Sequence, residues 1–348
     1  KDIIDLSIGD TDFITDEGII NAAFRDAKAG YTRYGDPKGD PELIDAVCRA
    51  WQEDFEQKLP HDHVLVSASS CLGMALVMFS ILDPGDEVIV FSPYFPMYRT
   101  QIELAGGVCV DVPTYASEDY AIDEARLRAA ITPRTKAIIF NNPTNPTGMA
   151  YGNDTLEMLA RVAKEYDLLI AADEIYTTYL YEGDFRPLRT LPGMAERVIT
   201  LNSFSKNFLM TGWRVGVIIA EPELLEVMND INGSLIYTAP SISQRAAIHA
   251  LSMRREIREK YVTAYRDRIF YTADRIEKIP YLSLVRPKGT FYLFPGIEKT
   301  GLTDDEFCNV LLDKAHVLVS HGKAFGTAGA GHFRIACTVG IDTLKIAF

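Results

Sequence analysis

The sequence predicts an α/β fold in which helices enclose a mostly parallel sheet, followed by a smaller α+β part. Up to about Ile219, short and strongly apolar runs alternate with helical segments, as expected for strands buried on both faces of a parallel sheet. From about Ser241 the pattern changes to a long charged helical stretch and then to short strands. A length of 348 residues is sufficient for two domains with a large core.

The individual elements follow from apolar periodicity and from turn residues. Leu43 to Phe55 has the period of an amphipathic helix, and Asp40-Pro41-Glu42 before it is typical of an N-cap, a first-turn proline and a first-turn acid. Further helices are expected at 72–82 and 155–166. Strands are expected at 64–66, 87–91, 135–140, 168–172, 198–201 and 215–219.

The C-terminal part reads differently. One helix is expected from about Gln244 to Lys278, then short strands near 282–285 and 290–293, and a helical segment at 342–348.

Composition and charge argue against several classes of function. With 35 Lys+Arg and 48 Asp+Glu the formal charge is −13, which does not favour nucleic acid or an anionic membrane as a partner. No apolar run approaches the ~18–20 residues of a membrane span. The five cysteines are widely spaced without a CxxC pair, which indicates free thiols in a reducing cytoplasm. Neither they nor the six histidines show the spacing of a metal site, so no metal is expected.

Chemically unusual residues follow several of the predicted strands. In an open parallel sheet, ligands bind beyond the carboxyl ends of the strands. Asp173-Glu174 follows one strand, the amide-rich loop 141–148 follows another, and the hydroxyl-rich turn 67–71 precedes a helix whose N-terminus could hold a phosphate. Each of these also has an ordinary explanation as a turn or a helix cap, so none is decisive alone.

The run from Ser203 to Gly216 is decisive. It combines a lysine, two hydroxyls, an arginine eight residues later and two glycines without helical or strand periodicity. The run resembles the lysine motif of class I aminotransferases of pyridoxal-phosphate fold type I, S-x-S-K-x(5)-G-x-R-x-G. Matches in the family's order extend over nearly the whole chain: Leu6-Ser7-Ile8-Gly9-Asp10, Tyr31-Thr32-Arg33-Tyr34 with Gly39, the turn 67–71, Pro93 to Tyr98, Asn145-Pro146-Thr147-Gly148, Asp173-Glu174-Ile175-Tyr176 and Phe333-Arg334-Ile335.

The resemblance implies a large cofactor-binding α/β domain at 30–245, with a mostly parallel seven-stranded-type sheet. It also implies a small α+β domain formed by both chain ends, 1–29 and 246–348. The implied activity is transfer of an amino group between an L-amino acid and a 2-oxo acid. This is a ping-pong reaction that passes through pyridoxamine phosphate, and the implied cofactor is pyridoxal 5′-phosphate.

The resemblance also assigns roles around the cofactor ring. Lys206 is implied to bind the cofactor covalently and later to move a proton from the substrate α-carbon, which requires a pKa below the usual value of about 10.4. Asp173 is implied to pair with the ring nitrogen, and Tyr176 and Asn145 to hydrogen-bond the ring's 3-hydroxyl oxygen. Phe95 occupies the position of the aromatic side chain that stacks on the ring.

Several donors are implied for the phosphate group and for the substrate. The phosphate donors are the backbone N–H groups of Ser70 and Cys71, the hydroxyls of Ser203 and Ser205, and Arg214. Tyr34 resembles the tyrosine that reaches the phosphate of the neighbouring subunit, which implies a homodimer with shared sites. Arg334 is implied to bind the substrate α-carboxylate as a bidentate pair, with Gly9 and Asn145 beside it.

The choice of substrate is less specified. Family members that prefer aspartate often carry a cation where this chain has Cys71, and a thiol offers no such charge. Six aromatic side chains could line an apolar pocket: Tyr94, Phe95, Tyr98, Tyr176, Tyr179 and Tyr292. Aromatic, methionine-like or broad specificity is therefore favoured over strict aspartate specificity.

Two other functions fit parts of the pattern. A carbon–sulfur β-lyase on the same fold would use the same Lys206 and Asp173 but expel a β-substituent. It ranks second because the ending Gly212-Trp213-Arg214-Val215-Gly216 looks more like the transaminase pattern. The ligand-sensing domain of a transcription regulator would require an N-terminal DNA-binding module, and the sequence shows neither that segment nor a basic patch.

Overall fold

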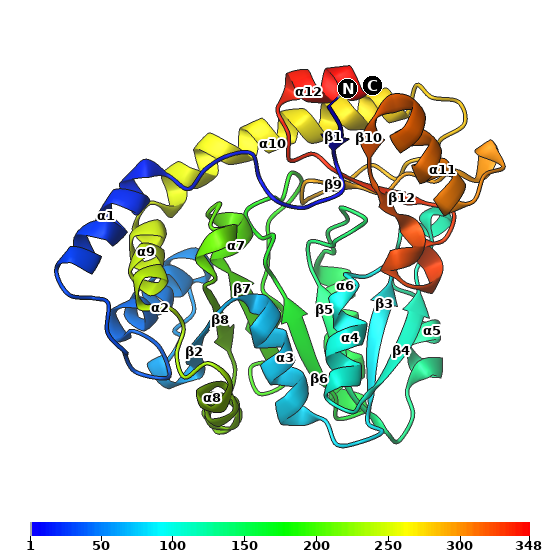
Figure 1. Ribbon diagram of the computed structural model, residues 1–348. Helices are drawn as coiled ribbons and strands as arrows, with labels where there is room; N and C mark the ends of the chain where they lie inside the picture. The colour runs from blue at the N-terminus through cyan, green and yellow to red at the C-terminus, as the bar shows by residue number, and fades with distance from the viewer. Residues whose placement is uncertain (1) are drawn as a thin grey trace.

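A seven-stranded sheet forms the centre of the molecule in a computed structural model that describes residues 2–348 (Figure 1). The strand order is β2-β8-β7-β6-β5-β3-β4, and only β8 runs antiparallel to its two neighbours. The prediction of a mostly parallel sheet is thus confirmed. The strands are β2 (Val64–Ser67), β3 (Glu87–Ser92), β4 (Val108–Pro113), β5 (Thr135–Asn141), β6 (Leu169–Asp173), β7 (Val198–Ser203) and β8 (Gly216–Ile219).

Helices cover both faces of this sheet because its side chains alternate between two cores. In β3, Val88 and Val90 join one core, while Ile89 and Phe91 join the other, which is the period of two expected for a strand buried on both sides. The first core is completed by α3 (Ser70–Ile81), α4 (Met97–Leu104) and α8 (Pro222–Leu235). The second is completed by α5 (Glu124–Ala130) and α6 (Asn153–Glu165).

A further helical layer packs against the edge formed by β2 and β8. It consists of α1 (Glu17–Lys28), α2 (Pro41–Phe55), α9 (Ser241–Ser252) and the first turns of α10 (Arg254–Ile276). The prediction of a single helix from Gln244 to Lys278 is wrong, because two helices, α9 and α10, are separated at Met253. Neither proline nor glycine marks the break. The break separates α9, which packs on α1 and α2, from α10. Helix α10 extends from this layer to the second part of the molecule (Figure 1).

The second part has its own core, to which both ends of the chain contribute. Strand β1 (Ile4–Asp5) pairs in parallel with β10 (Val317–Leu318), and the termini lie side by side in Figure 1. The other elements are β9 (Tyr292–Leu293), β11 (Ser320–His321) and β12 (Phe333–Ala336), which form a three-stranded sheet, with α11 (Asp304–Val310) and α12 (Ile341–Ala347). The strand predicted near 282–285 is wrong: Ser283 makes only an isolated bridge to Gly296.

Within residues 2–348, no helix combines the length and the apolar character that crossing a membrane requires.

Candidate active site

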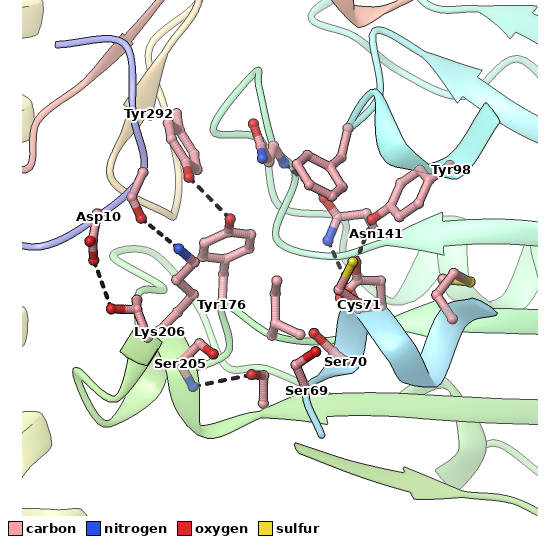
Figure 2. A pocket seen from close by; sticks show the side chains of 18 of the residues that line it. Asp10, Ser69, Ser70, Cys71, Tyr98, Asn141, Tyr176, Ser205, Lys206 and Tyr292 are labelled. Carbon is pink, nitrogen blue, oxygen red and sulfur yellow. Dashed lines mark hydrogen bonds between the residues drawn. The ribbon is translucent and has the colours of Figure 1, made fainter. Parts of the chain in front are cut away.

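A cavity of about 400 Å³ lies beyond the carboxyl ends of β5, β6 and β7. Segments from both ends of the chain contribute to its wall, so residues far apart in sequence meet here. Apart from Tyr34, all the site residues predicted from the sequence line it: Gly9, Ser70, Cys71, Phe95, Asn145, Asp173, Tyr176, Ser203, Ser205, Lys206, Arg214 and Arg334. Figure 2 shows several of these side chains around the cavity.

Asp173 places a buried carboxylate at the tip of β6. Burial raises its pKa to about 6, although the hydrogen bond from Tyr98 favours the charged form. Tyr98 donates to Oδ2, whereas Oδ1 is buried with no hydrogen-bond partner among residues 2–348. A buried carboxylate oxygen without a donor is costly, so this atom fits a ligand that brings a positive N–H group, such as a protonated pyridine ring.

Lys206 lies on α7 (Phe204–Asn207), a single helical turn directly after β7. Its Nζ donates to the carbonyl oxygen of Gly9 at 2.5 Å, and its own carbonyl accepts from the hydroxyl of Tyr179 at 2.8 Å. The amide of Asn207 donates to Thr177 at 3.0 Å. These bonds fix the backbone around the lysine, and its amine lies in the cavity (Figure 2).

A group of anion-binding donors lies at the N-terminus of α3. Ser69 caps this helix with a positive φ of 98° and accepts from the N–H of Leu72 at 3.3 Å. The backbone of Gly216 lies close to this turn. A Cβ on Gly216 would lie 2.8 Å from the backbone nitrogen of Ser70, so only glycine leaves the turn undisturbed. A helix N-terminus with free N–H groups is a binding site for phosphate.

Side chains extend this group of donors. The hydroxyl of Ser203 accepts from the N–H of Ser205 at 3.1 Å, and the exposed guanidinium of Arg214 lies on the same wall of the cavity. Arg214 has a left-handed backbone (φ 56°) and donates to the carbonyl of Thr211 at 2.8 Å. Hydroxyls, helix N–H groups and a planar cation together fit a phosphate dianion.

Arg334, on β12, brings a third cation to the wall of the cavity. Its Nη1 donates to Asn145 Oδ1 at 2.9 Å, and its guanidinium lies over the ring of Tyr292 at 4.5 Å. The Nε atom is buried, and the described part of the chain offers it no hydrogen-bond partner. The backbone of Gly9 passes close to the hydroxyl of Tyr292. A Cβ at this position would lie 1.8 Å from that hydroxyl oxygen, so only glycine permits the approach.

The aromatic residues divide into two groups. Phe95, Tyr98, Tyr176 and Tyr292 line the cavity, and the hydroxyls of Tyr176 and Tyr292 lie 3.2 Å apart. Burial raises the pKa of Tyr176 well above its usual value, and the neighbouring hydroxyl of Tyr292 raises it further. Placing Tyr94 and Tyr179 in this lining was wrong.

Both are core residues. Tyr94 accepts a hydrogen bond from Arg99, and Tyr179 packs edge-on against Tyr265 while its hydroxyl reaches the backbone of Lys206.

Three polar residues that line the cavity were not predicted as site residues from the sequence: Asp10, Gln101 and Asn141. Asn141 donates to the carbonyl of Asp173 and accepts from the N–H of Asn145, so it fixes the two strand tips relative to each other. Its position as the first residue of the amide-rich loop was an available signal. Gln101 donates to the carbonyl of Cys71 at 2.8 Å, and Asp10 accepts from Thr211 at 2.8 Å, but neither contact has a local sequence signal.

Tyr34 stands apart from the cavity of its own chain. Its side chain is 83% exposed, and its ring rests edge-on against Tyr237 with 5.0 Å between the centroids. The role predicted for Tyr34 concerns the neighbouring subunit's site and stays a prediction.

No group of three or more His, Cys, Asp or Glu side chains in the described residues is arranged to hold a metal ion.

The fold and the site together define the class of the protein. A largely parallel sheet with a lysine, a buried aspartate and an arginine around one cavity is the arrangement that the resemblance to aminotransferases implies. Residues 1–347 match the sequence profile of the family described as aminotransferase class I and II, and the chain belongs to that family. The protein is therefore an aminotransferase.

Known relatives extend along the full chain. The aspartate aminotransferase of Pyrococcus abyssi is 36% identical over 100% of this chain and 90% of its own length. The arginine–pyruvate transaminase of Pseudomonas aeruginosa is 34% identical over 100% of this chain and 88% of its own. The solved structure of an aromatic aminotransferase from Pyrococcus horikoshii OT3 superposes with a TM-score of 0.97 at 33% identity, covering 100% of this chain and 94% of that one.

The contact between Tyr98 and Asp173 predicts a pH effect. The phenol favours the ionised carboxylate, so Tyr98→Phe raises the pKa of Asp173 above about 6 and increases the protonated fraction at neutral pH. The carboxyl stretching band in infrared difference titrations of the cofactor-free protein reports this, with Asp173→Asn to assign the band. Tyr94→Phe is the matched control, because this buried tyrosine does not touch Asp173. An unchanged titration in Tyr98→Phe would contradict the assignment.

Proposed function

We propose that this aminotransferase uses pyridoxal 5′-phosphate to exchange an amino group between an L-amino acid and a 2-oxo acid, in a ping-pong reaction through the pyridoxamine form. When bound, the cofactor supplies an electron sink for the substrate α-carbon. One observation carries the proposal. The Lys206 amine, a buried and unpartnered oxygen of Asp173, and the guanidinium of Arg334 all face the same cavity.

In this proposal five side chains act at or beside the ring. Asp173 would hold the ring nitrogen in its protonated form, because its Oδ1 has no other hydrogen-bond donor among residues 2–348. Tyr176 and the NH₂ group of Asn145 donate to the ring's 3-hydroxyl oxygen; the carbonyl oxygen of Asn145 is already bound to Arg334. The Nζ of Lys206 takes the proton from the substrate α-carbon and later returns one. Phe95 provides a face for stacking.

The phosphate end draws on the donors at α3 and α7. The N–H groups of Ser70 and Cys71, the hydroxyls of Ser203 and Ser205, and Arg214 surround the place where two negative charges would sit. Tyr34 adds a donor from the neighbouring subunit, so the active unit is a homodimer.

Two further expectations belong to the proposal. The proposed division is a large domain at 30–245 and a small domain formed by 1–29 and 246–348. The pairing of β1 with β10 supports the contribution of both chain ends to the small domain, whereas α1 packs in the helical layer against β2 and β8. Cytoplasmic location rests on the cysteine pattern, and the five thiols are all free.

The substrate carboxylate is proposed to bind Arg334. The free Nε edge of this guanidinium gives it a donor to offer, and the nearby carbonyl of Gly9 and amide of Asn145 limit how a small acid can lie. Tyr292, beneath the guanidinium, excludes water and strengthens the charge–charge contact.

The substrate side chain is proposed to be aromatic, methionine-like or broadly variable. Cys71 brings no cation to the cavity, while Phe95, Tyr98 and Tyr292 present apolar ring surface. Such a wall favours polarizable and aromatic groups over a second carboxylate.

Lys206→Ala provides the central test. Removing the amine should abolish the absorption band of the lysine-linked cofactor and lower kcat by at least about a hundredfold, the contribution of a positioned acid–base group. Absorption spectroscopy and single-turnover assays with a panel of amino acids measure both effects, and Lys164→Ala, a surface lysine on α6, is the control. Full activity in Lys206→Ala would overturn the mechanism. Release of pyruvate and ammonia from cysteine conjugates, without formation of the pyridoxamine spectrum, would indicate the β-lyase instead.

Arg334→Lys tests the carboxylate contact. A lysine retains the charge but cannot present two parallel donors, so KM should rise for amino acids and for 2-oxo acids alike. The expected loss in kcat/KM is about tenfold or more, corresponding to one hydrogen bond to a charged group. Steady-state kinetics with both substrate classes measure it, with cofactor absorbance as the check that the site is intact. Unchanged constants would exclude this role.

Cys71→Lys tests the basis of specificity. A cation at this wall of the cavity should raise kcat/KM for aspartate relative to phenylalanine by about tenfold, the effect of one new charged contact. Cys71→Met, which adds similar bulk without charge, should leave the ratio close to that of the parent. If both variants behave alike, charge at position 71 does not control the choice of substrate.

A further inference from the structure

A single buried arginine joins both ends of the segment that carries Tyr34. Arg245, on α9, has only 8% of its side chain exposed. Its Nε donates to Asp26 in the last turn of α1 at 2.8 Å, and its Nη1 lies 3.2 Å from Asp40 and 3.0 Å from Glu42, which begin α2. The segment 29–40 connects these two helices, so one guanidinium closes this connection at both ends.

The same helix also grips the segment between its ends. The guanidinium of Arg245 lies over the ring of Tyr31 with 4.2 Å to the centroid, a favourable cation–π contact. The hydroxyl of Ser241 donates to the carbonyl of Arg33 at 2.5 Å, and Gln244 accepts from the N–H of Asp40 at 2.6 Å. Three side chains of α9 thus fix a stretch that contains neither helix nor strand.

Tyr34 itself has little support from its surroundings. Its side chain is 83% exposed, and its ring contact is with Tyr237, which precedes α9. The place of the phenol therefore depends on the backbone of 29–40, and that backbone depends on α9.

We infer that Arg245 is a positioning residue, which sets where Tyr34 stands at the phosphate end of the neighbouring subunit's site. This rests on the proposed function, in which Tyr34 reaches that phosphate. Without the guanidinium, Asp26, Asp40 and Glu42 would meet as like charges, and the segment would move away from α9. A lysine cannot replace it, because a single ammonium does not span carboxylates on two helices while stacking on a ring.

The test compares affinity for pyridoxal phosphate in three variants of the full chain. Arg245→Lys and Tyr34→Phe should each raise the dissociation constant about tenfold, the effect of one hydrogen bond to a charged group. Because Arg245 acts through Tyr34, the double variant should be no weaker than Tyr34→Phe alone. Titration of the cofactor-free protein, followed by absorbance, measures the constants without reference to turnover.

Arg254→Lys is the matched control. Arg254 is also largely buried and bridges two helices, pairing from α10 with Glu53 and Asp54 of α2, but it does not touch 29–40. Its loss should lower the thermal midpoint without changing cofactor affinity. If Arg245→Lys does not fold, Tyr31→Leu removes the stacked ring while leaving the ion pairs intact, and should weaken binding in the same direction.

The outcomes separate the two hypotheses. If Tyr34→Phe weakens cofactor binding but Arg245→Lys does not, the positioning role is overturned and the shared site remains supported. Additive losses of affinity in the double variant lead to the same conclusion. An unaffected Tyr34→Phe overturns the shared site, and the positioning role with it.

Discussion

The active site depends on the course of residues 4–15 between the two parts of the molecule. The backbone of Leu6 bonds to Leu318 on one side and to Ala336 on the other, and its side chain is buried in the second core. A few residues later, Gly9 accepts from Lys206 and Thr15 donates to the backbone beside the lysine turn. One extended segment therefore ties the sheet of Arg334 to the helical turn of Lys206. This strap, rather than either core alone, constrains the distance between the guanidinium of Arg334 and the amine of Lys206.

Electrostatics explain why an acidic protein can serve anionic ligands. The chain carries a formal charge of −13, yet Lys206, Arg214 and Arg334 line one cavity from three separate elements. Low-dielectric walls such as the ring of Tyr292 strengthen their fields locally. The surplus acids lie mostly at the surface, where they pair with arginines or with solvent. Net charge therefore describes solubility and non-specific partners, while the sign of the site is decided by which side chains the fold turns inward.

Sequence reasoning reached the parts of the fold and site that are encoded locally. Fully buried strands such as β5 were predictable from their apolar runs, but β4 was missed because Val108 and Cys109 are partly exposed and Asp111 interrupts the pattern. Motif spacing identified residues that the structure brings together around the cavity, since many of them lie at or just beyond the carboxyl ends of β5, β6 and β7. Gln101 and the division between Tyr98 and Tyr94 were not predictable, because they depend on how α4 turns against the sheet.

Two adjacent carboxyls at the tip of β6 have different surroundings. Asp173 and Glu174 are neighbours in sequence and both are buried, but they serve opposite sides of the strand. Asp173 faces the cavity, while Glu174 accepts from the N–H of Leu188 at 3.1 Å. Burial raises the pKa of Glu174 to about 8, with the charge of Asp173 adding to the effect, whereas that of Asp173 rises only to about 6. Burial therefore disfavours ionisation of both carboxyls, and more strongly that of Glu174, so negative charge at this tip is favoured on the carboxyl directed at the cavity.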